Sequence, residues 1–111
     1  MARADRTFDV VVLRQAERDL EDIYDFIAVE DARTADRFPT AIRDALSSLI
    51  TLPLRGNVPP ELRSLGVTEY REIRSTVYRI IYRVTAERVV VHCVLDGRRD
   101  MPSLLQRRLL R

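Results

Sequence analysis

The sequence predicts an α+β fold in which an N-terminal strand and an antiparallel helical hairpin pack on a four-stranded, mainly antiparallel sheet, followed by a short C-terminal helix. Three observations predict it: one strand-like segment precedes two amphipathic helical segments, three β-rich segments follow, and residues 101–110 again show leucines at helical spacing. The 111 residues suffice for one hydrophobic core but not for two, so residues 1–111 are predicted to form a single domain.

Hydrophobic periodicity defines the first two elements. Apolar side chains alternate over residues 7–13, where Phe8, Val10 and Val12 share one face, which predicts a strand. Over residues 15–29 the apolar residues recur at i, i+4, i+7, i+8 and i+11, and the acidic residues lie on the outer face. This spacing predicts an amphipathic helix, whose apolar stripe consists of Ala16, Leu20, Ile23, Tyr24 and Ile27.

A second amphipathic helix is predicted to begin after Thr34, a residue type that caps helix N-termini, and to end before Pro53. Pro39 lies in its first turns and removes one backbone donor, which predicts a kink or a later start. The short connection between the two helices predicts an antiparallel hairpin that packs on the sheet. Residues 52–66 contain glycine and several prolines, and we expect them to form an irregular connector.

Three segments rich in β-branched and aromatic residues are predicted to form an antiparallel meander, at residues 70–75, 77–85 and 88–95. One face of the middle strand suits a core covered by helices and carries Tyr78, Ile80, Tyr82 and Val84. The opposite face is predicted to be partly solvated and carries Val77, Arg79, Ile81 and Arg83. Finally, Asp100 can cap a helix over residues 101–110, whose leucines need a surface on this domain or on a partner.

The charges are unevenly distributed, and all 19 basic residues are arginines. Residues 1–54 carry 7 arginines and 11 acidic residues, whereas residues 55–111 carry 12 arginines and 6 acidic residues. This layout predicts two faces of opposite sign. It is more typical of a protein that binds charged partners than of a carrier of apolar ligands.

Several classes of site and location are disfavoured by the sequence. Cys93 is the only cysteine, which excludes an intramolecular disulfide and a zinc site built from paired cysteines. No uncharged run approaches the roughly 20 residues of a membrane span, and the opening MARADRTF is not followed by the apolar stretch of a secretory signal. We therefore expect a cytoplasmic protein with no membrane segment, no metal site and no cofactor.

The order and spacing of four segments resemble the RelE/ParE toxin superfamily from Phe8 to Leu110. These segments are AERDLEDIYDFI, ADRFPTAIRDALSSL, YREIRSTVYRIIYRV and VVVHCVLDGRRDMPSLL. The long helical hairpin and the ending LDGRRDMPSLLQRRLL are similar to the ParE branch. The resemblance implies the toxin of a type II toxin-antitoxin system, which poisons DNA gyrase and is neutralised by a ParD-like antitoxin in a hetero-oligomer. It also implies contact with nucleic acid only through the target or the antitoxin complex.

The resemblance also indicates which residues could contact partners. Arg71, Arg79, Arg98 and Arg99 occupy positions where the family keeps basic residues, and we expect them to bind an anionic target or the acidic tail of the antitoxin. Apolar residues on the open face of the sheet would form a groove for that tail, namely Ile73, Val77 and Ile81. Alternatively, the C-terminal helix covers the same patch.

A nuclease of the RelE type is the alternative function. Cleavage of mRNA on the ribosome needs groups that move protons as well as cations that stabilise the transition state, and arginine can supply only the cation. Asp96 and His92 are the candidates for proton transfer. Because a lone histidine in the middle of a strand is more often a packed residue and aspartate is a weak base, we favour a toxin without catalytic residues.

Overall fold

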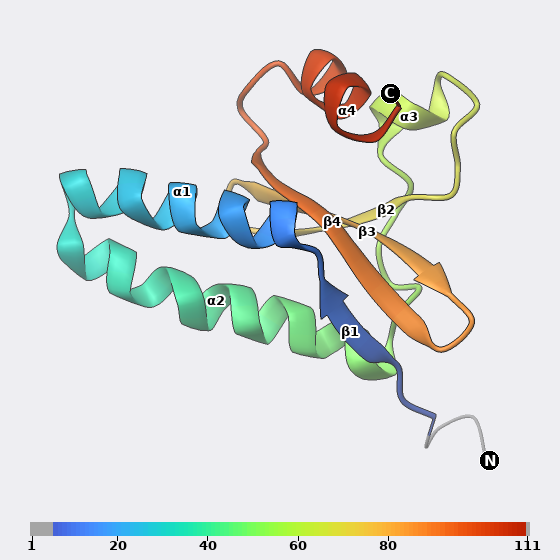
Figure 1. Cartoon of the computed structure of the whole chain (residues 1–111), viewed down its shortest axis with the longest axis horizontal. Helices are drawn as coiled ribbons and strands as arrows, with labels where there is room; N and C mark the ends of the chain where they lie inside the picture. The colour runs from blue at the N-terminus through green and yellow to red at the C-terminus, as the bar shows by residue number, and fades with distance from the viewer. Residues whose placement is uncertain (1–5, 111) are drawn as a thin grey trace.

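A mixed sheet with helices on both faces forms the protein, for which a computed structural model describes residues 6–110 (Figure 1). The long helical hairpin covers one face of the sheet, and two short helices cover the other. The elements are β1 (Asp9–Val12), α1 (Arg14–Glu30), α2 (Ala32–Thr51), α3 (Pro60–Arg63), β2 (Arg71–Ser75), β3 (Tyr78–Thr85), β4 (Arg88–Asp96) and α4 (Met101–Leu109). The predicted α+β class is therefore confirmed. The prediction lacked α3, which lies inside the connector.

The strand order of the sheet is β1-β4-β3-β2. The three later strands form the predicted antiparallel meander, whereas β1 pairs with β4 in parallel, with Asp9 opposite Arg88 and Val12 opposite Val91. The register of β3 and β4 shifts between Ile81 and Tyr82, because β4 contains one extra residue there. A bulge of this kind changes which face of a strand the following side chains occupy.

The hairpin consists of two amphipathic helices joined at Asp31. This residue caps α2, because its carboxylate accepts hydrogen bonds from the backbone N–H groups of Arg33 (3.0 Å) and Thr34 (3.4 Å). The prediction that Thr34 is the cap is therefore wrong; its hydroxyl instead donates to Asp31 at 2.8 Å. The helix also continues unbroken through Pro39, so the predicted late start does not occur.

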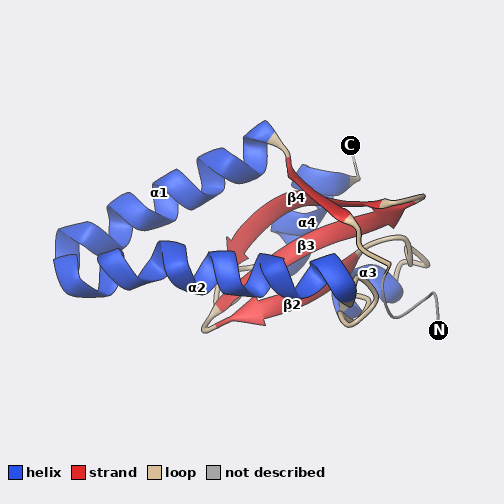
Figure 2. Ribbon diagram, turned by 90° about the horizontal axis from the view of Figure 1, so that it is seen from below, coloured by secondary structure: helices blue, strands red, loops and turns tan. Residues whose placement is uncertain are grey.

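The sheet separates two hydrophobic cores (Figure 2). The first lies between the sheet and the hairpin, and includes Phe38, Leu49, Ile80, Tyr82 and Val91. The second lies beneath α3 and α4, and includes Leu62, Ile81, Cys93, Leu104 and Leu105. The second face of the sheet was expected to be partly solvated, but the connector and the C-terminal helix bury its central residues.

The two edges of the sheet differ in how they are covered. At the outer edge of β2, Asn57 of the connector forms a bridge with Glu72 through two backbone hydrogen bonds of 3.2 and 2.8 Å. At the opposite edge, the backbone N–H groups of Asp9 and Leu13 donate to the carbonyl oxygens of Glu87 and Val91. Because alternate residues of a strand point their backbone groups to opposite sides, those of Val10 and Val12 face away from β4. No helix within residues 6–110 is long and apolar enough to span a membrane.

Candidate functional site

The turn that follows β4 presents two of the predicted arginines. Its backbone is held in place because Gly97 N–H donates to Val77 O (2.8 Å) and Arg99 N–H donates to Asp96 O (3.1 Å). A Cβ atom on Gly97 would lie 2.9 Å from Cδ of Arg79 and 3.0 Å from Val77 O. Glycine is therefore required for the turn to pack this closely against Val77 and Arg79.

Asp96 holds Arg98 at this turn. Its carboxylate accepts hydrogen bonds from Nε (2.9 Å) and Nη2 (2.7 Å) of Arg98 and from the Arg98 backbone N–H (2.9 Å). The hydrogen bonds from the Arg98 side chain are the main cause of a lowered pKa of Asp96. Asp96 is consequently ionised and already bonded to a cation, while the Arg98 side chain remains 65% exposed.

Arg99 is exposed and has no carboxylate partner within residues 6–110. It borders a hollow of about 340 Å³ between α1 and the end of the sheet, whose other lining residues are Asp22, Ile23, Phe26, Tyr78 and Asp96. The pKa of Tyr78 is raised, chiefly by burial and then by the charge of Asp96, so its phenol stays protonated at neutral pH. The hollow thus combines an apolar wall with a phenol, a guanidinium and two carboxylates.

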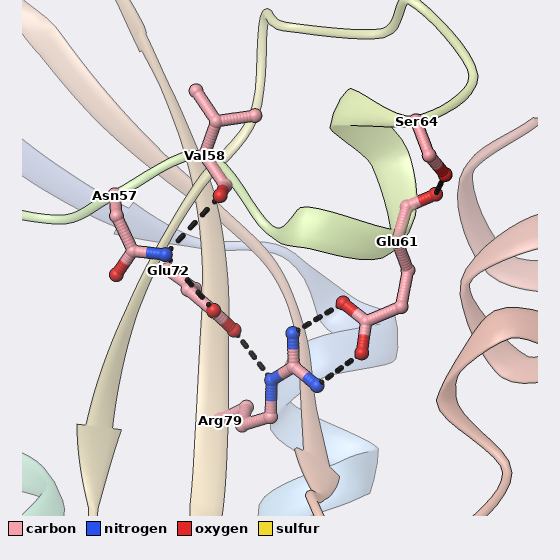
Figure 3. Close-up of polar contacts among 6 residues, drawn as sticks. All are labelled: Asn57, Val58, Glu61, Ser64, Glu72 and Arg79. Atoms are coloured by element: carbon pink, nitrogen blue, oxygen red, sulfur yellow. Dashed lines mark hydrogen bonds and ion pairs between the residues drawn. The ribbon is translucent and has the colours of Figure 1, made fainter.

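Arg79 occupies a different environment, between two glutamates beneath α3 (Figure 3). Its Nη1 and Nη2 atoms donate to Glu61 at 2.8 and 2.7 Å, and its Nε donates to Glu72, which also accepts from Asn57 Nδ2 at 3.2 Å. Arg79 and Glu72 are each only 3% exposed. The hydrogen bond from Arg79 is the main cause of a lowered pKa of Glu61. Arg79 therefore ties the connector to the sheet and presents no open surface.

Arg71 also binds the connector, through hydrogen bonds from Nη1 to the carbonyl oxygens of Gly56 (2.7 Å) and Leu54 (3.3 Å). It begins β2, whereas the turn with Arg98 and Arg99 packs against Val77, beyond the other end of β2. The structure therefore does not place the four predicted arginines in one cluster. Only Arg98 and Arg99 are together and exposed.

His92 lies in the middle of β4, half-buried, with its ring edge-on to Tyr70 at a centroid distance of 5.3 Å. Its pKa is lowered, first by burial and then by the charge of Arg83, so the imidazole is neutral at pH 7. His92 and Asp96 are four residues apart in one strand, which corresponds to roughly 13 Å. The two candidates for proton transfer therefore cannot act on one reacting group.

The three residues predicted to line an antitoxin groove do not share a surface. Ile73 is 5% exposed in the core beneath the hairpin, whereas Ile81 is fully buried in the core beneath α4. Val77 lies in the turn between β2 and β3 and packs against the first core. Within residues 6–110, these three side chains therefore do not line one groove. At Ile81 the alternative holds, because the C-terminal helix α4 covers this residue.

A large apolar groove lies elsewhere, between α1, α2 and β1. It has a volume of about 550 Å³, and its apolar lining consists mainly of Val10, Val12, Leu20, Tyr24, Phe38, Ile42 and Leu46. The exposed charged residues Glu21, Asp25 and Arg43 also line it. The sequence contains a signal for this groove, since the apolar stripes of two long helices are wider than a four-residue strand can cover.

Comparison with known proteins identifies the family. The sequence model of the ParE toxin of the type II toxin-antitoxin system parDE matches residues 10–101. The chain belongs to the ParE toxin family. This assignment makes it a toxin of the RelE/ParE superfamily and confirms the resemblance described above. No curated protein sequence matches the chain significantly.

Two solved structures share the fold of this ParE-family toxin. One is the chromosomal ParDE toxin-antitoxin system from P. aeruginosa, with a TM-score of 0.66 and 19% identity over 79% of this chain and 94% of that chain. The other is the toxin-antitoxin complex RelBE2 from Mycobacterium tuberculosis, with a TM-score of 0.58 and 21% identity over 83% of this chain and 93% of that chain. At such identities the likeness concerns the fold alone.

One polar connection in the ParE-family toxin has no counterpart in the sequence prediction. Asp19 of α1 accepts hydrogen bonds from the backbone N–H of Val94 (2.9 Å) and from Nη1 (3.0 Å) and Nη2 (2.8 Å) of Arg108. The sequence predicts no partner for either residue. Their pairing instead joins α1, β4 and α4. The partners are 89 residues apart, so no local sequence pattern could reveal it.

Proposed function

We propose that this ParE-family toxin inhibits DNA gyrase by binding it, without cleaving a substrate. The observation that carries the proposal is the state of the charged groups at the exposed turn. Asp96 is ionised and bonded to Arg98, and His92 faces Tyr70 elsewhere on the sheet. The turn therefore offers cations for contact, while its one carboxylate is held by Arg98 and is thereby weakened as a base.

The alternative, a RelE-like ribosome-dependent mRNA endonuclease, requires such a pair because RNA cleavage needs a base for the 2′-OH and an acid for the leaving oxygen. Asp96 could serve only as a base, and its bonds to Arg98 lower its basicity further. Arg79, a candidate for phosphate binding, is occupied by Glu61 and Glu72. The support for this alternative is limited to one carboxylate beside two guanidinium groups and the Tyr78 phenol.

We further propose that a ParD-like antitoxin binds the groove between α1, α2 and β1. The groove is a wide apolar surface, and a toxin without its antitoxin would expose it to water. An amphipathic segment of the antitoxin would bury the lining of Leu20, Tyr24 and Leu46, while its polar side chains contact the charged residues at the groove.

The decisive experiment compares the two activities with the same purified toxin. Gyrase supercoiling and gyrase-dependent DNA cleavage are measured at rising toxin concentration, and mRNA integrity is measured in a translation extract. We expect supercoiling to fall and cleaved DNA to accumulate, with mRNA intact. Cleavage of mRNA that disappears in Asp96→Asn, with gyrase unaffected, would contradict the proposal and establish the alternative.

A further inference from the structure

We infer that the toxin contacts its protein target through a composite surface made of one side of α1 and the turn after β4. This tip surface comprises Ile23, Phe26 and Val29 of α1, together with Tyr78 and Arg99. The inference rests on the proposed function, because it assigns the surface to gyrase rather than to the antitoxin.

Apolar exposure marks the α1 part of this surface. Phe26 is 65% exposed and Val29 is 87% exposed, the two highest values among the large hydrophobic residues that the structure describes. The hairpin projects beyond the sheet at this end, so its helices leave these side chains uncovered (Figure 1). Ile23, Phe26 and Val29 follow one another at i, i+3 and i+6, which places them in one row along the helix.

The turn after β4 adds polar groups beside this row. Phe26 and Ile23 line the same hollow as Tyr78 and Arg99. The backbone bonds of Gly97 and Arg99 hold the turn before any partner arrives. A surface that is fixed in advance loses less entropy on binding, and aromatic residues and arginine dominate the energetics of protein interfaces.

The charges around the hollow specify the chemistry of the partner. Asp96 is paired with Arg98, so the cation at the hollow that lacks a carboxylate within the described residues is Arg99. Asp22 also lines the hollow and has no bonded cation within the described residues. The complementary partner is therefore a protein segment that presents an apolar side chain against Phe26, a carboxylate against Arg99 and a hydrogen-bond donor against Asp22. A guanidinium and a carboxylate can form two parallel hydrogen bonds, which gives orientation as well as affinity.

This tip surface is separate from the proposed antitoxin groove, because the two lie on opposite sides of α1. Leu20, Glu21, Tyr24 and Asp25 line the groove, whereas Asp22, Ile23 and Phe26 line the hollow. Substitutions on one side can therefore change one interaction and leave the other intact.

The test uses Phe26→Ala and Arg99→Glu in the full-length toxin, with two matched controls on exposed residues elsewhere. Leu54→Ala removes a side chain that is 60% exposed, close to the 65% of Phe26, and Arg63→Glu reverses an exposed charge on α3. Gyrase-dependent DNA cleavage gives the toxin concentration for half-maximal effect, and calorimetry gives the affinity for the antitoxin. Circular dichroism checks that each variant is folded.

We expect Phe26→Ala and Arg99→Glu each to raise the half-maximal concentration about tenfold or more, as for residues that dominate an interface, and to leave antitoxin affinity unchanged. The control variants should match the wild type in both measurements. Wild-type potency in both tip variants overturns the inference while the proposed function stands. Loss of antitoxin affinity with normal gyrase cleavage also overturns it. A wild-type toxin without effect on gyrase overturns the proposed function and this assignment together.

Discussion

At the scale of single residues, the arginines of this toxin differ in how many carboxylates surround each of them. Arg79 is bonded to two and is buried, Arg108 and Arg98 are each bonded to one, and Arg99 has none within the described residues. A buried guanidinium held by two carboxylates serves the fold. One that remains unpaired on a rigid turn can serve a partner.

The first prediction concerns Arg79→Ala, which leaves Glu72 as a buried carboxylate without its cation. Breaking a buried pair in this way is expected to lower the free energy of unfolding by about 3–5 kcal/mol, measured by urea denaturation. Arg63→Ala, at an exposed position, should change it little. Combining Arg79→Met with Glu72→Gln should recover part of the loss. An unchanged denaturation midpoint for Arg79→Ala would show that the cluster does not hold the connector.

The second prediction is a pH dependence that originates at Glu61. Its pKa in the folded protein lies below the ordinary value of 4.5 because Arg79 donates to it. Between the two pKa values, the unfolded chain therefore binds more protons than the folded protein. The stabilisation that the Glu61–Arg79 pair gives the fold is present above about pH 4.5 and is lost as pH falls through the folded-state pKa. Denaturation curves between pH 6 and pH 3 should show a smaller loss of stability for Glu61→Gln than for the wild type. Asp31 and Asp96 also have lowered pKa values, but they are present in both proteins and cancel in the comparison. The same dependence of unfolding free energy on pH in both proteins would therefore contradict the assignment to Glu61.

At the scale of elements, α4 covers one face of the sheet and is attached by both apolar and ionic contacts. Leu104 and Leu105 pack on Ile81 and Cys93, and Arg108 binds Asp19 of α1. Asp100 caps the helix as predicted, because its carboxylate accepts a hydrogen bond from Ser103 N–H at 3.3 Å. The burial that results raises the pKa of the Cys93 thiol to about 12. Cys93 therefore reports whether α4 is in place.

The third prediction uses that thiol. Arg108→Ala removes the ion pair with Asp19, which is worth about 1 kcal/mol. The fraction of molecules in which α4 is detached should rise, and thiol labelling of Cys93 at pH 8 should become about fivefold faster. Arg108 itself lowers the pKa of Cys93, so its removal alone would slow the reaction. Faster labelling thus reports opening of α4. Arg107→Ala, at the exposed neighbouring position, is the control and should label at the wild-type rate.

The elements themselves were largely predictable, because long helices and β-branched strands leave a periodic pattern. α1, α2 and the meander of β2, β3 and β4 are confirmed within a few residues. The four-residue helix α3 is too short to show a period. The cap of α2 was misplaced because Asp31 and Thr34 are both good capping residues, and geometry alone decides between them.

The sites were less predictable than the elements, because they depend on contacts between distant segments. The exposure of Arg98 and Arg99 agrees with their assignment as contact residues, which stays a prediction. The burial of Arg79 depends on Glu61, 18 residues earlier, and the burial of Ile81 depends on how α4 folds back. The open groove between the hairpin and β1 was not predicted, although the wide apolar stripes of the two helices were a signal for it.

At the scale of the whole molecule, α1 separates two candidate binding surfaces, the apolar groove and the tip surface. This arrangement would let one small domain contact an antitoxin and a target through different residues. The sheet and its two cores hold both surfaces in fixed positions.

The fourth prediction follows from this separation. A ParD-like antitoxin present at about 100 times its dissociation constant should stabilise the toxin by about 2.7 kcal/mol, seen as a higher melting temperature. Tyr24→Ala in the groove should reduce that gain, whereas Phe26→Ala on the other side of α1 should retain it. Each variant is compared with its own melting temperature without antitoxin. An equal gain for Tyr24→Ala and the wild type would place the antitoxin elsewhere.

The parallel pairing of β1 with β4 has a consequence for how the protein is made. Asp9 lies opposite Arg88, so the first strand has no place in the sheet until most of the chain has been synthesised. At about 5–20 residues per second, β1 waits roughly 4–16 seconds for its partner strand. Through that interval the nascent chain carries an uncovered apolar segment at its beginning, while the turn with Arg98 and Arg99 does not yet exist. A chain that stops before residue 88 therefore lacks the partner strand of β1 and cannot complete this sheet.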